Sequence, residues 1–260
     1  MPLFHEGDFW DQYSQQDAMY ETDGVAESTP KLLYDFDTES SAVACSQAAL
    51  LLTFWSPYGN KKVNTVWLSI AIQQARLAEA HLYASLPQNN IHTSALKRLW
   101  WCCIIRDRLL SLGVRRSILI PRTQFDIDRH PPLGAMDLAD EIAYSRVYNL
   151  ETKKGLVAII ARIAELCVVL TDVLTLAYPP DVLAWDSQND QDRLQREGKN
   201  IEKCKLALDQ WYSSVSSRFP LFNGTANDAA YLPGQQVGVG NNYCHDSVIL
   251  YTNLMYMYYQ

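Results

Sequence analysis

Positive charge, paired cysteines and the short motifs of common enzyme classes are all scarce in this sequence. The formal net charge is -7 and the sequence pI is about 5.2. Lysine and arginine occur as isolated pairs, such as Lys61-Lys62 and Arg115-Arg116, and not in clusters. Because binding to phosphate backbones needs clustered basic residues, the sequence argues against direct binding to nucleic acid.

Motifs for hydride transfer, phosphoryl transfer and zinc hydrolysis are missing. No H-E-x-x-H, G-x-S-x-G or glycine-rich phosphate loop occurs, and the short run 238–240 (GVG) follows no predicted strand. Asp126, Asp128 and His130 resemble a metal cluster in composition, but a Zn²⁺ or Mg²⁺ site needs more ligands at fixed geometry. We therefore expect neither a cofactor nor a metal ion.

The six cysteines include no C-x-x-C pair, which is typical of buried, reduced thiols. The first residues, MPLFHEGDFWDQ, are acidic and lack the apolar stretch of a secretory signal. These two features predict a cytoplasmic or nuclear protein. The most apolar segment, 155–178, is interrupted by Arg162, Glu165 and Asp172, so it predicts a core helix and no membrane partner.

Aromatic residues and helical periodicity are abundant. The chain has 7 tryptophans and 15 tyrosines among 260 residues, and apolar positions repeat at helical spacing. Capping residues, prolines and turn clusters divide the chain into about seven helices with long loops, an all-α helical bundle. The predicted helices cover residues 42–55, 65–83, 93–113, 137–148, 155–177, 192–219 and 245–260. We expect an N-terminal arm (1–39) packed on one helical domain (40–260), with an irregular crossing segment at 117–134.

Charge interrupts the apolar stretch 96–113, LKRLWWCCIIRDRLLSLG. An unpaired buried charge is expensive, so Arg106 and Arg108 each need a partner. Asp107 is the candidate partner nearest in sequence, and Asp126 and Asp128 are alternatives from beyond the corner. Such ion pairs predict structural struts that connect the helix to the following loop. The other interpretation is that these charged residues bind a ligand directly or act in catalysis.

Several segments in order resemble one family. They are SQAALLLTFW, NTVWLSIAIQQARLAEAHLY, the Trp-Trp … Asp-Arg element at 100–108, FDIDRHPPL, LALDQWYSSV and the tyrosine-rich end. Together they resemble the fungal-specific transcription factor domain, the middle homology region of fungal zinc binuclear-cluster regulators, in its cutinase-activator-like branch. The resemblance covers roughly residues 40–260.

The sequence departs from this family at several points. A Leu-Gly-Leu-His-like turn in the family is Ala-Glu-Ala-His here (78–81), and the usual Gly-Arg-Pro is Gly113-Val114-Arg115. No zinc cluster or heptad dimerisation segment precedes the domain, and the domain looks truncated at its C-terminal end. The resemblance therefore implies a ligand-sensing helical domain that lacks its own DNA-binding module.

Two functional hypotheses follow, and a third is a structural protein without ligand. The favoured one is a stand-alone small-molecule-binding protein of fungal secondary metabolism. Under this hypothesis the protein is a cofactor-independent cyclase, Diels-Alderase or isomerase. It would bind an apolar natural-product intermediate and hold it in one reactive conformer. The alternative is a ligand-sensing regulatory domain or co-regulator of transcription.

Candidate site residues follow from residue chemistry. The catalytic candidates are His81, Arg106, Asp107, Tyr243 and His245. The aromatic candidates for lining a hydrophobic pocket between helices are Trp67, Trp100, Trp101, Trp211, Tyr212 and Tyr251. The expected partners are an apolar small molecule and a second copy of the chain in a homodimer.

Overall fold

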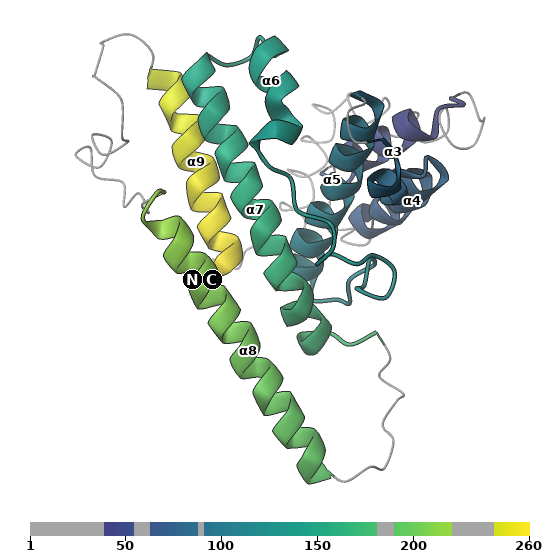
Figure 1. The fold of residues 1–260 in the computed structure, drawn as a ribbon, viewed down its shortest axis with the longest axis vertical. Coiled ribbons are helices and arrows are strands. Elements are labelled where there is room, and N and C mark those ends of the chain that lie inside the picture. The colour runs from purple at the N-terminus through teal and green to yellow at the C-terminus, as the bar shows by residue number, and fades with distance from the viewer. Residues whose placement is uncertain (1–38, 55–62, 88–90, 181–189, 220–241) are drawn as a thin grey trace, which may run out of the picture.

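The structure, a computed structural model, describes residues 39–54, 63–87, 91–180, 190–219 and 242–260 (Figure 1). Within these ranges every regular element is helical, which confirms the all-α prediction. The elements are α3 (Ala42–Leu52), α4 (Val63–Leu77), η2 (Ala80–Ser85), α5 (Ile91–Val114), η3 (Ala135–Leu138), α6 (Ala139–Tyr144), α7 (Leu150–Ala177), α8 (Asp190–Ser216) and α9 (Asn242–Tyr259). The predicted arm, apart from Glu39, lies outside the described residues.

Side-chain caps fix two helix starts. The Ser41 hydroxyl accepts a hydrogen bond from the Ala44 amide, so Ser41 caps the N-terminus of α3. The Asn149 side chain accepts from the Thr152 amide at 2.9 Å. Because Asn149 caps α7, this helix begins five residues earlier than the apolar run suggested.

Two helix ends differ from the prediction. The helix predicted to reach residue 83 ends at Leu77, because Glu79 adopts a left-handed conformation (φ 56°) and a short 3-10 turn follows. Gly113, expected to end the next helix, lies inside α5. Arg115 (φ 55°) takes the left-handed position that terminates it.

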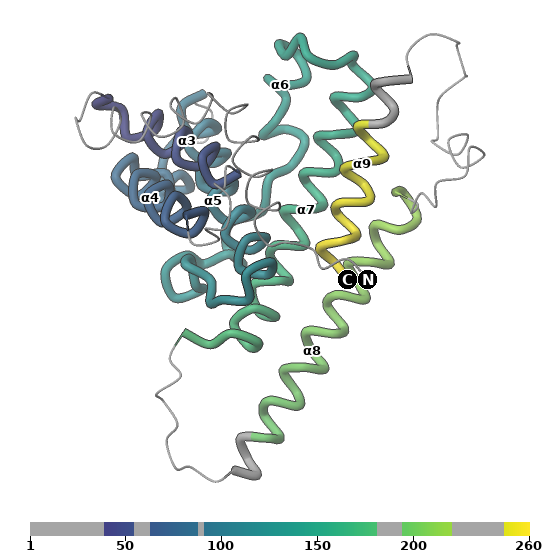
Figure 2. The backbone as a smooth tube through the Cα atoms, turned by 180° about the vertical axis from the view of Figure 1, so that it is seen from behind, coloured from purple at the N-terminus to yellow at the C-terminus, as the bar shows by residue number. Residues whose placement is uncertain are grey.

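The helices form two groups that meet at α5 and α7. Helices α3, α4 and α5 pack together, while α7 packs with α8 and α9 (Figures 1 and 2). Helix α8 extends well past the end of α7 in both views. The predicted crossing segment between α5 and η3 contains no regular element.

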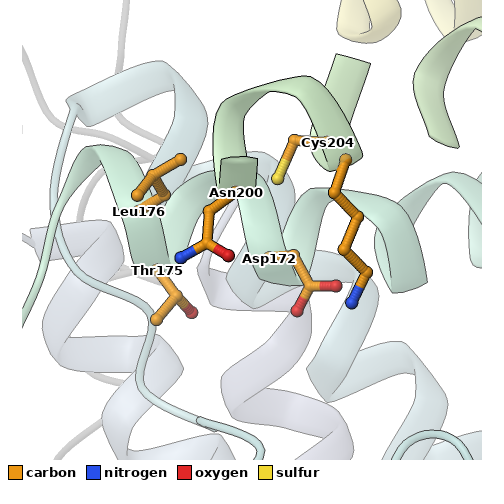
Figure 3. Close-up of a pocket in the computed structure, with 6 residues that line it drawn as sticks. Asp172, Thr175, Leu176, Asn200 and Cys204 are labelled. Carbon is orange, nitrogen blue, oxygen red and sulfur yellow. The ribbon is translucent and has the colours of Figure 1, made fainter. Parts of the chain in front are cut away.

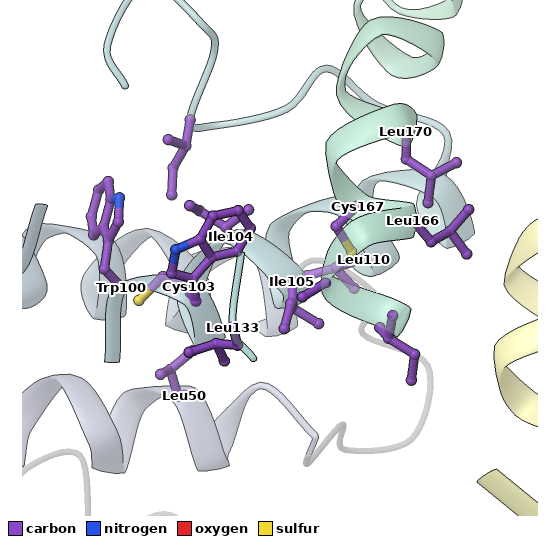
Figure 4. Packing of buried hydrophobic residues seen from close by; sticks show 14 of the residues in the cluster. Leu50, Trp100, Cys103, Ile104, Ile105, Leu110, Leu133, Leu166, Cys167 and Leu170 are labelled. Carbon is purple, nitrogen blue, oxygen red and sulfur yellow. The ribbon is translucent and has the colours of Figure 1, made fainter. Parts of the chain in front are cut away.

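The core follows α5 from α3 to α7. Trp100, Trp101 and Ile104 are fully buried, and Leu166 and Leu170 of α7 complete the packing (Figure 4). Burying each such side chain contributes about 1.5–3 kcal/mol to the free energy of unfolding. Because α5 contributes many of these buried side chains, it is the central element of the domain. No helix among the described residues has the length and apolar character needed to cross a membrane.

The described cysteines are all free, as predicted, but they are not all buried. Cys45, Cys103 and Cys167 are buried, whereas Cys204 is half-buried and Cys102 is exposed. Desolvation raises the pKa of the Cys167 thiol to about 12. Cys167 is therefore an uncharged core residue.

Candidate functional site

A buried ion pair lies in the middle of α5. The Asp107 carboxylate (Oδ2) is 2.6 Å from Nη1 of Arg108, and both side chains are buried. Asp107 also accepts hydrogen bonds from the backbone amides of Leu119 and Ile120 at 3.0 and 3.1 Å. The pairing predicted between Asp107 and Arg108 is thus confirmed, and the carboxylate fixes the chain that follows α5.

Arg108 extends this network to α7. Its Nε donates to the Thr171 hydroxyl at 3.0 Å, and its Nη2 donates to the Ile120 carbonyl at 2.8 Å. Desolvation lowers the pKa of Arg108, and the Asp107 charge opposes that shift. We call Asp107, Arg108, Thr171 and Ile120 the strut, because they tie α5, the crossing segment and α7 together.

A second ion cluster lies directly beside the strut. Arg122 donates to both Asp172 oxygens, at 2.7 and 3.1 Å, and to Asp128 at 2.6 Å. Burial disfavours the Arg122 charge, but the two carboxylates outweigh burial and raise the pKa of Arg122. Asp128 therefore does not reach back to α5 as the alternative pairing proposed, and Asp126 pairs with Arg129.

A groove opens next to this cluster, between α7 and α8 (Figure 3). It is open to solvent, and its volume is about 270 Å³. The lining residues are Asp172, Thr175 and Leu176 of α7 and Asn200, Lys203 and Cys204 of α8. We call this set the α7–α8 groove.

The two walls of the groove carry opposite charges. Asp172 stands on α7, and Lys203 stands on α8. Among the described residues, Lys203 takes part in no ion pair within 4.0 Å. Desolvation raises the pKa of the Cys204 thiol; Asp172 adds to this shift and Lys203 opposes it. The groove can therefore offer both an acceptor and a cation to a polar ligand.

The catalytic candidates predicted on α5 make structural contacts. Arg106 donates from Nε to the Thr53 hydroxyl at 2.7 Å and from Nη2 to the Thr53 carbonyl at 2.6 Å, and its guanidinium lies over the Phe54 ring. It thereby caps the C-terminal end of α3, where a cation is favourable. Asp107 belongs to the strut.

His81 lies in η2 beside Trp100, with ring centroids 5.6 Å apart. Its Nδ1 and the Trp100 Nε1 are buried and have no hydrogen-bond partner among the described residues. Desolvation lowers the pKa of His81, Arg76 adds to the shift and Glu79 opposes it. The side chains of Tyr243 and His245 lie outside the described residues, although both residues belong to α9.

The aromatic candidates separate into two groups. Trp67, Trp100 and Trp101 are buried in the core around α5, and Trp101 Nε1 donates to the Tyr83 hydroxyl at 3.2 Å. Phe125 packs edge-on against Trp100 and Trp101. This first group lies among α4, α5 and the crossing segment.

The second aromatic group joins α8 and α9. Tyr259 stacks on both Trp211 and Tyr212, with centroids 5.6 and 5.0 Å apart, and Trp211 Nε1 donates to the Arg162 carbonyl. Tyr251 stands apart on the exposed side of α9, 43% exposed. The predicted aromatic residues therefore do not converge on one another.

None of the predicted site residues lines the α7–α8 groove. One signal was present in the sequence, because Asp172 interrupts an otherwise apolar helix. Asn200 and Lys203 carry no such signal, since they look like ordinary polar residues on the surface of a charged helix. Only the pairing of α7 with α8 brings the three together.

Comparison with known proteins matches the chain to one protein family and to fungal proteins named as transcription factors. A family model described as the fungal specific transcription factor domain matches residues 9–213. Cutinase transcription factor 1 beta of Fusarium vanettenii is 32% identical over an alignment of 160 residues that covers 57% of this chain and 18% of that protein. A protein named Transcription factor, from Fusarium pseudograminearum (strain CS3096), is 25% identical over an alignment of 258 residues that covers 88% of this chain and 26% of that protein. The chain spans roughly a quarter of these curated relatives at most. No solved structure matches it.

Proposed function

Because this chain belongs to the fungal-specific transcription factor domain family, we propose that it is a regulatory module of a transcription regulator. In this proposal the module acts in the nucleus and senses a small molecule in the α7–α8 groove. Contact with DNA is made by another module, since the chain has a net charge of -7 and no basic cluster.

The observation that carries the proposal is the adjacency of groove and strut. Thr171, which accepts from Arg108, is followed directly by Asp172, which lines the groove. Arg122 holds Asp172 to the crossing segment, two residues after Ile120 of the strut. A ligand bound at Asp172 would therefore alter the hydrogen bonds that join α7 to α5. A sensor needs such a difference in contacts between its ligand-free and ligand-bound states.

The same geometry favours regulation over the enzyme hypothesis of the sequence analysis. Arg106 and Asp107 use their hydrogen-bonding groups to cap α3 and to hold the strut. The groove is smaller than the roughly 300–1,000 Å³ typical of pockets for drug-sized ligands, and polar side chains line it. These features match a small polar ligand better than an apolar natural-product intermediate.

A reporter assay tests the proposal. The full chain is fused to a heterologous sequence-specific DNA-binding module in a fungal host that carries a matching reporter gene. We expect the fusion to change reporter output severalfold relative to the DNA-binding module alone. An Asp107→Asn fusion should lose this effect, and a Glu151→Gln fusion should keep it because Glu151 is exposed and belongs to neither the groove nor the strut. Equal output from the fusion and from the DNA-binding module alone, at matched protein levels, would contradict the proposal.

A further inference from the structure

We infer that the α7–α8 groove binds a small zwitterion, a molecule with one ammonium and one carboxylate such as an α-amino acid. This inference rests on the proposed function, because it names the class of ligand that the sensor would detect. It depends on the opposite charges of the two groove walls and on the size of the groove.

The α7 wall has spare negative charge. Arg122 is one cation bound by two carboxylates, Asp128 and Asp172, so the cluster carries a net charge of about -1. Each Asp172 oxygen accepts one hydrogen bond from Arg122, which leaves further lone pairs for another donor. The Asp172 side chain is 40% exposed and lines the groove, so an ammonium group can reach it.

The α8 wall has spare positive charge. Lys203 has no carboxylate partner within ion-pair distance in the described part of the chain, and Asn200 lies three residues before it on the same helix. A lysine ammonium and an amide NH₂ group are both donors, and a carboxylate accepts from several donors at once. A carboxylate is therefore the group that this wall would hold.

Size and polarity limit the rest of the ligand. A volume of about 270 Å³ lies just below the usual range for drug-sized ligands, so the groove suits a molecule of amino-acid size. Leu176 gives the lining its apolar part, which suits a short uncharged side chain. A simple anion or a simple amine would satisfy only one of the two walls.

Three probes that share the same branched isobutyl group separate these alternatives. They are leucine (zwitterion), isocaproate (carboxylate only) and isoamylamine (ammonium only). Each is titrated into the isotopically labelled full chain, and shifts of the backbone amides of Thr175, Asn200 and Cys204 give the dissociation constants. We expect leucine to bind at least about tenfold more tightly than either single-charge probe, since it engages both walls.

Matched variants locate the site. Lys203→Met keeps the length of the side chain but removes its charge, and it should weaken leucine binding about tenfold or more. Lys199→Met, on the exposed surface of the same helix outside the groove, should leave binding unchanged. Asp172→Asn should weaken isoamylamine and leucine but not isocaproate, with thermal unfolding used to confirm that the variant is folded.

Three outcomes overturn the inference. They are isocaproate binding as tightly as leucine, leucine binding that survives Lys203→Met, and no shift at the groove amides with any probe. The reporter assay is independent of these titrations. If the fusion regulates the reporter but leucine does not bind, the ligand class is wrong and the regulatory function stands.

Discussion

Individual residues show how this domain tolerates charge in its core. Asp107 is fully buried, yet it accepts hydrogen bonds from Arg108, Leu119 and Ile120, and Arg116 approaches it at 3.6 Å. A buried ion pair with all groups bonded adds little net stability, but removing one partner leaves an uncompensated charge. The stability of the strut therefore depends on the carboxylate.

Asp107→Asn should lower the free energy of unfolding by about 3–5 kcal/mol, because Arg108 then keeps a buried charge without its carboxylate. Urea unfolding followed by tryptophan fluorescence measures the change. The control is Asp128→Asn, which removes an exposed ion-pair partner and should cost less than about 1 kcal/mol. Similar losses in the two variants would show that the strut does not have the role assigned to it.

His81 should make stability depend on pH. Its pKa in the folded protein lies below 6.5, chiefly through desolvation, with Arg76 adding to the shift and Glu79 opposing it. The unfolded chain therefore takes up a proton first as pH falls through about 6.5, and the folded state loses stability until its own pKa is passed. In His81→Gln, the loss of unfolding free energy between about pH 7.5 and about pH 5.5 should be smaller than in the wild type. An equal loss in both proteins would show that His81 does not cause the pH dependence of stability.

At the level of elements, helix junctions decide where the helices end. The periodicity of α4 continues past residue 77, but the helix stops there because Glu79 is left-handed. This residue occupies the place of glycine in the Leu-Gly-Leu-His-like turn of the family. A left-handed conformation raises the free energy of a residue with a Cβ atom by roughly 1–2 kcal/mol. For glycine, which has no Cβ atom, the same conformation has little cost.

Glu79→Gly should therefore raise the free energy of unfolding by about 1 kcal/mol, less the extra entropy that glycine gives the unfolded chain. Glu79→Ala is the matched control, because it removes the carboxylate but keeps the Cβ atom and should give no such gain. Chemical denaturation of the three proteins measures both changes. Equal stabilisation by alanine and glycine would assign the effect to charge and not to the backbone.

The sequence predicted the helices well where one face is apolar over many turns. Helices α5 and α7 and the irregular segment between α5 and η3 all appear as expected. The end of α4 was predicted six residues too late and the end of α5 one residue too early, because non-glycine residues take the left-handed positions. The groove could not be predicted, since Asp172 and Lys203 are 31 positions apart and only the packing of α7 on α8 brings them together.

At the scale of the whole molecule, α5 and α7 join two groups of helices. The contacts between them include the buried strut, and the α7–α8 groove lies one residue along α7 from Thr171. Ligand binding on one side of α7 can therefore change how α7 is held on the other side. The groove and the strut together form the regulatory element that we propose.

The most direct test of this account compares two lysine variants in the reporter assay. Lys203→Met removes the groove cation, and Lys199→Met removes a cation from the exposed surface four residues earlier on α8. The account predicts that the Lys203→Met fusion loses its regulated reporter output while the Lys199→Met fusion behaves as wild type, with both proteins present at equal levels. Unchanged regulation in the Lys203→Met fusion would contradict the claim that this groove controls the module.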